Sequence, residues 1–227
     1  MTIEDWKPMA EQGIAEAQYN LGLIYSRGEE VSRDDVEAVK WYRLAAEQGF
    51  AESQTNLGLM YGRGLGVEQS YQIAFKWYRV AAEQGLAQAQ HNLGVMYGRG
   101  QGVLVNWHEA IKWFKLSAEQ GYAHAQYNLG LIYSRGEGVS RDDMEAAKWY
   151  RLSAEQGITG AQSNLGLMYE KGRGVEQDYI KAHKWFNIAG VNGNETGRRN
   201  ADIIEKKMTP GQVAIAAGLA REWIEKL

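Results

Sequence analysis

Apolar residues recur along the chain at intervals of three and four, the spacing of amphipathic helices. One such face within residues 14–49 comprises Ala17, Leu21, Ile24 and Tyr25. A second face comprises Ala38, Trp41, Tyr42 and Ala45. The glycine-containing segment 26–31 separates the two faces, so we predict two antiparallel helices joined by a short loop.

This helix pair recurs every 36 residues, a period typical of helical repeat proteins. The tripeptide Asn-Leu-Gly marks each copy, at 20–22, 56–58, 92–94, 128–130 and 164–166. We predict an all-α solenoid with an N-terminal half repeat, five full repeats and a C-terminal helical cap. The boundaries are 1–13 for the half repeat, 14–49, 50–85, 86–121, 122–157 and 158–193 for the repeats, and 194–227 for the cap.

A longer period of three repeats is also visible. Residues 19–49 and 127–157 differ at only four positions, although they lie 108 residues apart. The array therefore contains a partly duplicated block of three repeats.

Capping residues define where the helices begin and end. The second helix of each repeat is preceded by a good N-cap residue, namely Asp34, Ser70, Asn106, Asp142 and Asp178. Glutamates three residues later, at Glu37, Glu109 and Glu145, predict capping boxes. Gly22 lies on the apolar face of its helix, which predicts a neighbour too close for a Cβ atom. In the cap, we expect a degenerate helix around 200–207 and a final helix whose N-cap is Thr209.

Composition and charge exclude several classes of protein. The absence of cysteine excludes disulfides, thiolate metal sites and cysteine nucleophiles. A net charge of −3 argues against nucleic-acid binding, and the longest apolar stretch, 213–220, is too short to span a membrane. The first residues contain no apolar signal core, so we expect a cytoplasmic protein. The sequence does not determine the oligomeric state, and a monomer is the favoured expectation. A periplasmic location would follow if a leader had been removed.

The repeat motif resembles the Sel-one-like repeat (SLR) family, which is related to the tetratricopeptide repeats. The residues that carry the resemblance include Ala17, Leu21, Gly22, Tyr25, Gly28, Val31, Ala38, Trp41, Tyr42, Ala45 and Gly49. The resemblance implies a right-handed superhelix that acts as a protein-interaction adaptor. It also allows an immunity protein that neutralises a secreted phospholipase-like toxin. A β-lactam-binding or β-lactam-hydrolysing role belongs to a disulfide-braced branch, from which this cysteine-free chain departs.

A row of asparagines on the first helices is the main candidate binding feature. Related tetratricopeptide domains use the asparagine before Leu-Gly to bind the backbone of an extended peptide, because an amide both donates and accepts hydrogen bonds. The alternative is that each amide bonds within the repeat. The row comprises Asn20, Asn56, Asn92, Asn128 and Asn164, and the neighbouring candidates for partner specificity are Tyr19, His91, Tyr127 and His124. Thr55 and Ser163 belong to the same variable row as Tyr19.

The other candidates favour structural roles. The row that ends each first helix (Arg27, Arg63, Arg99, Arg135 and Lys171) is more consistent with helix-dipole complementation than with an acidic-ligand clamp. The recurring tryptophans are expected in the core, and Trp107 is expected under the preceding loop rather than as an exposed anchor. Two histidines, His91 and His124, are too few for a zinc site. No metal, cofactor or catalytic residue is predicted.

These observations predict a non-enzymatic adaptor that binds a peptide or protein in its concave groove. The immunity protein and the β-lactam-directed protein remain alternatives.

Overall fold

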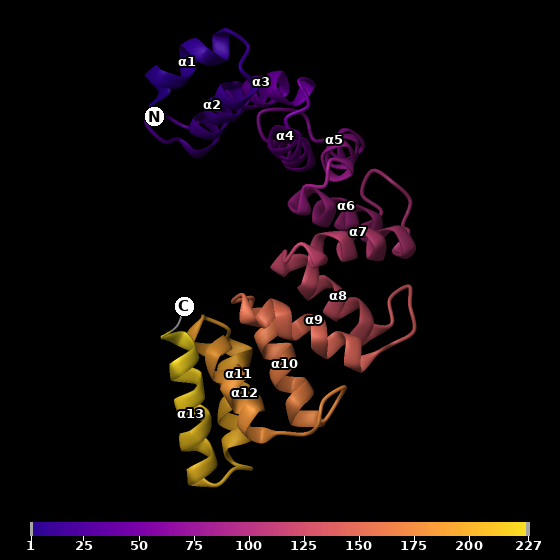
Figure 1. Cartoon of the computed structure of the whole chain (residues 1–227), viewed down its shortest axis with the longest axis vertical. Helices are drawn as coiled ribbons and strands as arrows, with labels where there is room; N and C mark the ends of the chain where they lie inside the picture. Colours follow the sequence, from indigo (N-terminus) through magenta and orange to yellow (C-terminus); the bar gives the residue numbers. More distant parts are fainter. Residues whose placement is uncertain (1, 226–227) are drawn as a thin grey trace. The chain divides into compact units, whose positions relative to one another are not determined.

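The computed structural model describes residues 2–225, which form thirteen helices and no strand (Figure 1). The helices are α1 (Ile3–Glu11), α2 (Ala15–Arg27), α3 (Asp35–Glu47), α4 (Ala51–Arg63), α5 (Tyr71–Glu83), α6 (Ala87–Arg99), α7 (Trp107–Glu119), α8 (Ala123–Arg135), α9 (Asp143–Glu155), α10 (Thr159–Lys171), α11 (Tyr179–Val191), α12 (Glu195–Glu205) and α13 (Pro210–Ile224). The predicted helix pairs of the five repeats are therefore confirmed.

The helices fall into two compact units, one that ends at Ser117 and one that starts at Ala118. In the first unit, each helix from α1 to α5 packs against the helix that follows it. In the second unit, α8 to α12 pack in the same sequential manner, and α13 packs against α11 (Figure 1). Packing between neighbours in the sequence is the arrangement expected of a repeat protein.

The predicted N-caps are present on the second helices. Asp34 accepts hydrogen bonds from the backbone N–H groups of Val36 and Glu37, both at 3.0 Å. Ser70, Asn106, Asp142 and Asp178 cap their helices in the same manner. Each cap satisfies a backbone donor that the helix itself leaves without an acceptor.

The predicted capping boxes are wrong for Glu37 and Glu145, because neither carboxylate returns to the backbone of the N-cap residue. Glu37 instead forms an ion pair with Lys40 at 3.0 Å, and Glu145 forms one with Lys148 at 3.3 Å. The backbone N–H groups of Asp34 and Asp142 donate instead to the carbonyl oxygens of Tyr25 and Tyr133, both at 2.9 Å, so no N-cap donor is left for either glutamate.

The core of each repeat confirms the predicted faces. The leucine of every Asn-Leu-Gly motif is at most 1% exposed. A Cβ atom on Gly22 would lie 2.5 Å from the Tyr42 ring, and one on Gly94 would lie 2.9 Å from the Phe114 ring. The close approach is thus between the first helix and the aromatic ring that follows the tryptophan of the second helix.

A buried glutamine joins successive repeats, and sequence analysis did not assign it a role. Gln54 is 3% exposed, and its Nε2 donates to the backbone oxygen of Ala46 at 3.1 Å. Gln84 donates in turn to the Gln54 side-chain oxygen at 2.7 Å. The equivalent glutamines make the same bond to the end of the preceding second helix, namely Gln18, Gln90, Gln126 and Gln162. Each bond gives a second donor to a carbonyl near the end of a helix, which also accepts from the backbone N–H of the glycine that follows that helix.

The C-terminal helices differ in part from the prediction. α12 begins earlier than the predicted segment 200–207, because Asn194 caps it by accepting from the backbone N–H of Gly197 at 2.9 Å. The predicted N-cap Thr209 is confirmed and forms a capping box with Gln212. No described helix combines the length and the apolar character that crossing a membrane requires.

Candidate binding surface on the first helices

The five asparagines of the predicted ladder are all half-buried on the first helices. Asn20 donates from Nδ2 to the Glu16 backbone oxygen at 2.8 Å, and Asn92 Oδ1 lies 3.2 Å from His91 Nδ1. Asn56 and Asn164 face the hydroxyl groups of Tyr42 and Tyr150 and lower their pKa values, against the larger effect of burial, which raises them. Part of the hydrogen-bonding capacity of the ladder is therefore used within the repeats.

A pocket of about 310 Å³ lies beside Asn92 in the first unit. Its polar lining includes Arg63 and Arg99, which end α4 and α6, and Tyr78 of α5. Its apolar lining consists of Leu59, Tyr71, Ala74, Val95 and Met96. Gly62 and the polar residue Gln101 complete the lining. The pocket thus combines two cations, an amide and an aliphatic floor, and no carboxylate lines it.

An equivalent pocket of about 190 Å³ lies beside Asn164 in the second unit. Its lining residues include Tyr150, Leu167, Met168 and Lys171, each 72 residues after a residue of the first pocket. This pocket differs by holding a carboxylate of its own, Asp143, where the first pocket has Tyr71. The surface is therefore built from a repeated design with locally changed chemistry.

The predicted specificity residues are positioned by aromatic packing. Tyr19 lies 5.1 Å from Phe50 between ring centroids, His91 lies 5.7 Å from Phe114, and Tyr127 lies 6.1 Å from Tyr150. All three are half-buried, whereas His124 is exposed and lies 5.7 Å from the Tyr122 ring.

Two members of the same variable row are not exposed. Thr55 is 2% exposed and Ser163 is 6% exposed, so these two side chains are not accessible to a partner. The reason is the size of the side chain. A short side chain at this position is covered by the neighbouring helices, whereas an aromatic ring extends beyond them.

The basic residue of each repeat ends its first helix, as predicted for a cation that complements the helix dipole. Arg27 forms an ion pair with Glu29 at 3.5 Å, and Arg135 forms one with Glu137 at 3.4 Å. Within residues 2–225, Arg63 and Arg99 make no ion pair. The residues at the position of Glu29 in their repeats are Leu65 and Gln101.

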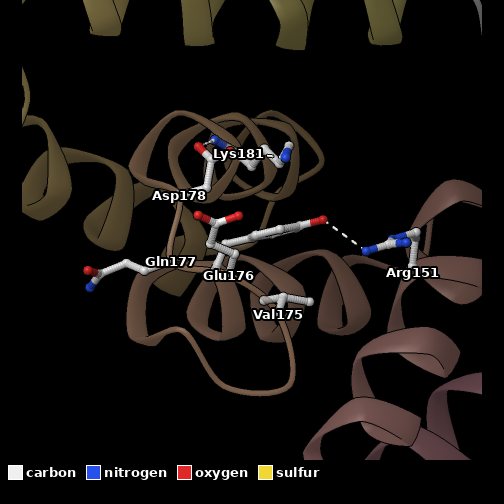
Figure 2. Close-up of a pocket in the computed structure, with 7 residues that line it drawn as sticks. Arg151, Val175, Glu176, Gln177, Asp178 and Lys181 are labelled. Carbon is white, nitrogen blue, oxygen red and sulfur yellow. Dashed lines mark hydrogen bonds and ion pairs between the residues drawn. The ribbon is translucent and has the colours of Figure 1, made fainter.

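A third pocket, of about 430 Å³, lies beside the loop before α11 (Figure 2). The guanidinium of Arg151 donates to the Tyr169 hydroxyl at 3.0 Å, and Lys181 pairs with Asp178 at 3.1 Å. Figure 2 shows Arg151 entering from one side and Asp178 and Lys181 from the other. Asp178 and Lys181 neutralise each other, and the Glu176 carboxylate in the lining offsets the charge of Arg151, which makes this pocket a weaker candidate for ligand binding.

The tryptophans of the second helices lie in the core, as predicted. Trp41, Trp149 and Trp185 are at most 8% exposed, and Trp77 and Trp113 pack against core clusters. A Cβ atom on Gly98 would lie 3.2 Å from the Trp107 ring, so this tryptophan packs on the end of α6.

Sequence analysis missed one buried histidine that is paired with a partly exposed glutamate. His183 is 1% exposed, and its Nε2 lies 2.8 Å from Glu205 Oε1. The other four repeats carry apolar residues at this position, namely Val39, Phe75, Ile111 and Ala147, and that contrast was the available signal. In the described part of the chain, no group of three metal-ligating side chains gathers.

The comparisons with known proteins agree with the repeat pattern. The sequence model of the family described as Sel1 repeat matches residues 15–50, 51–86, 87–122, 123–158 and 159–194. A search of curated proteins gave no match.

Three solved structures illustrate the structural similarity. The protective antigen c5321 of uropathogenic Escherichia coli, which displays an SLR fold, is 41% identical to this chain, with a TM-score of 0.91. The match covers 97% of this chain and 48% of the antigen. A Sel1 repeat protein from Oxalobacter formigenes shares 37% identity over 87% of this chain and 57% of its own, with a TM-score of 0.81. This chain therefore spans about half the length of these two proteins. The immunity protein Pa5087 from Pseudomonas aeruginosa shares the fold alone, with 21% identity over 92% of this chain and 81% of its own and a TM-score of 0.54.

Proposed function

Because the chain belongs to the Sel1 repeat family, we propose that it is a non-enzymatic adaptor that binds a peptide or protein along its first helices. Sel1-repeat solenoids are typically protein-interaction scaffolds. Each unit contributes its own asparagines of the ladder and one of the two equivalent pockets, beside Asn92 in the first unit and beside Asn164 in the second.

The recurrence of one pocket in both units is the observation that carries this proposal. Each pocket combines a half-buried amide with basic and aliphatic side chains. A peptide backbone needs donors and acceptors at regular intervals, and an amide in every repeat supplies both. Asn92 belongs to the first unit and Asn128 to the second, so a variant that replaces both removes one ladder amide from each unit.

The test is a quantitative pull-down from the cells of origin, followed by affinity measurement with the purified partner. Asn92→Ala/Asn128→Ala should weaken the complex by about tenfold or more, because each lost hydrogen bond costs about 0.5–1.5 kcal/mol. Gln12→Ala/Gln72→Ala is the matched control, since both side chains are exposed and lie outside this surface. Equal affinities of the two variants, with unchanged thermal unfolding, would overturn the proposal.

The non-enzymatic part of the proposal has a separate test. Among the described residues, no serine is hydrogen-bonded to a histidine or a carboxylate, so none is activated as a nucleophile. We expect no hydrolysis of a chromogenic β-lactam and no covalent adduct by mass spectrometry. Turnover above the uncatalysed rate would restore the enzymatic alternative.

A further inference from the structure

The pocket beside Asn92 contains two positive charges that no described residue neutralises through an ion pair. Arg63 and Arg99 both line it, both are exposed, and within the described residues neither makes an ion pair. The residues that line the pocket include no aspartate and no glutamate. We call this the acid-free pocket.

In two other repeats, a glutamate of the same repeat forms an ion pair with the arginine at the equivalent position. Glu29 and Glu137 each lie two residues after the arginine and pair with it, at 3.5 and 3.4 Å. In the repeats of Arg63 and Arg99 this position is Leu65 or Gln101. Two adjacent repeats therefore leave their guanidinium groups available, and both groups line the same pocket.

The equivalent pocket in the second unit holds an internal carboxylate beside its basic residues. Asp143 lines that pocket, and Arg141 donates to its two oxygens at 3.0 and 2.7 Å. The hydrogen bonds from Arg141 hold the pKa of Asp143 below its usual range. In the acid-free pocket Tyr71 replaces this aspartate, and Gln69 replaces its arginine partner.

We propose that the acid-free pocket binds a glutamate or aspartate side chain of the partner, with the carboxylate held by Arg63 and Arg99. Guanidinium groups donate in a fork that matches a carboxylate. Asn92 and the Tyr78 hydroxyl line the pocket as further donors, and burial raises the pKa of Tyr78 and keeps that hydroxyl protonated. Leu59 and Val95 provide an apolar surface for the methylene stem of the side chain. This assignment rests on the proposed binding function.

A free anion is a poorer occupant than a peptide side chain. Both arginines are exposed, so water and salt screen their attraction for a small ion. An acidic residue within an extended segment adds hydrogen bonds from the asparagine ladder and contact with the apolar floor. The occupant is therefore an acidic segment of a protein partner.

The first experiment measures binding of two labelled decapeptides by fluorescence anisotropy, one of alternating glutamate and alanine and one of alternating glutamine and alanine. The full chain should bind the glutamate peptide at least about tenfold more tightly, since hydrogen bonds to charged groups are the stronger ones. Equal binding of the two peptides, or no binding of either, would overturn the proposal. Inorganic phosphate at equal ionic strength should not displace the peptide, and displacement would assign the pocket to small anions instead.

The second experiment separates this pocket from general charge attraction. Arg63→Gln/Arg99→Gln should lose about tenfold in affinity for the glutamate peptide. Arg27→Gln/Arg135→Gln removes the same net charge from the self-neutralised repeats and should change the affinity by less than about twofold. Equal losses in the two variants would show that net charge alone drives binding. Arginine Nε–Hε signals, assigned with the single variants, should shift for Arg63 and Arg99 and not for Arg27.

The affinities of the two double variants for the natural partner test the acidic subsite separately from the proposed binding surface. If Asn92→Ala/Asn128→Ala weakens the partner complex while Arg63→Gln/Arg99→Gln leaves it unchanged, the binding surface is correct and the acidic subsite is wrong. If neither double variant weakens it, both are wrong. Weaker binding of the partner by both double variants supports both the binding surface and the acidic subsite.

Discussion

At the scale of single residues, the glycine of each Asn-Leu-Gly motif sets how closely the two helices of a repeat approach. We predict that Gly22→Ala destabilises the protein. A Cβ atom there would lie 2.5 Å from the Tyr42 ring, which is 2% exposed and hydrogen-bonded to Ser26. Overpacking costs about 1–3 kcal/mol, which exceeds the gain of up to about 1 kcal/mol in helix propensity. Urea unfolding provides the measurement.

Gly218→Ala is the control for this prediction. Gly218 is also a helix-interior glycine, but nothing lies within 4 Å of a Cβ atom built on it. This substitution should stabilise the protein by up to about 1 kcal/mol through helix propensity alone. Equal effects of the two substitutions would show that the contact with Tyr42 does not limit the approach of the helices.

The Asp143–Arg141 pair makes the stability of the fold depend on pH. The hydrogen bonds from Arg141 lower its pKa in the folded state, so the pair stabilises the fold above the unfolded pKa of about 3.9. That contribution is lost as the pH falls through the lowered pKa. Arg141→Gln should raise the pKa of Asp143 toward its ordinary value, which a carboxyl ¹³C NMR titration measures. An unchanged pKa would assign the shift to other groups.

Residues with one dominant local role were predictable from the sequence, whereas residues with competing partners were not. The N-cap of Asp34 and the close approach at Gly22 follow from spacing and residue type. Glu37 pairs with Lys40 because the N-cap N–H of Asp34 donates to the Tyr25 carbonyl, a contact across the loop that spacing alone does not reveal. The role of Gln54 required knowing which repeat packs behind it, although its recurrence in every repeat was visible.

At the scale of helices, the buried glutamine determines how one repeat joins the next. Gln54→Ala should cost about 0.5–1.5 kcal/mol, because the Ala46 carbonyl loses its side-chain donor and keeps only backbone donors such as the Gly49 N–H, while the exposed Gln84 amide loses its acceptor. Gln88→Ala, at an exposed glutamine of α6, should change the stability by less than about 0.5 kcal/mol. Thermal unfolding measures both, and similar values would assign Gln54 no role in joining the repeats.

The contact between α11 and α12 depends on the His183–Glu205 pair. Glu205→Ala should cost about 1–3 kcal/mol, because the buried imidazole loses its partner and its Nδ1 has no partner in the described structure. His183→Val/Glu205→Ala should recover most of that loss, since Val39 occupies this position in the first repeat. A double-mutant cycle, with the free energy of unfolding measured in urea, gives the coupling energy between His183 and Glu205. Additive effects of the two substitutions would show that the pair does not contribute to stability.

At the scale of the whole molecule, this all-helical SLR solenoid should respond to damage locally. Leu93 is fully buried, and Leu93→Ala should cost about 2–5 kcal/mol by leaving a cavity. Hydrogen exchange should then rise most in α5 and α6 and least in α12 and α13, because each repeat contacts only its neighbours. A uniform rise over all helices would indicate that the array unfolds as a single unit.

The binding surface was less predictable than the helices that build it. The asparagine row and the basic row could be located from the period, because helical geometry places equivalent residues on one stripe. The difference between paired Arg27 and unpaired Arg63 lies in the loop residues Glu29 and Leu65, which the repeat motif does not constrain. The burial of Thr55 depended on side-chain length relative to neighbouring helices.

The similarity of the junctions between repeats has a consequence for how such a chain can change its length. The glutamine bond and the Asn-Leu-Gly packing recur with little change, and residues 19–49 and 127–157 differ at four positions. A genetic crossover between the DNA encoding these two segments would insert or delete 108 residues in frame. Every new junction would already possess its full set of contacts. Recombination can therefore alter the number of binding sites in one step, while point mutation adjusts the charge of each site separately.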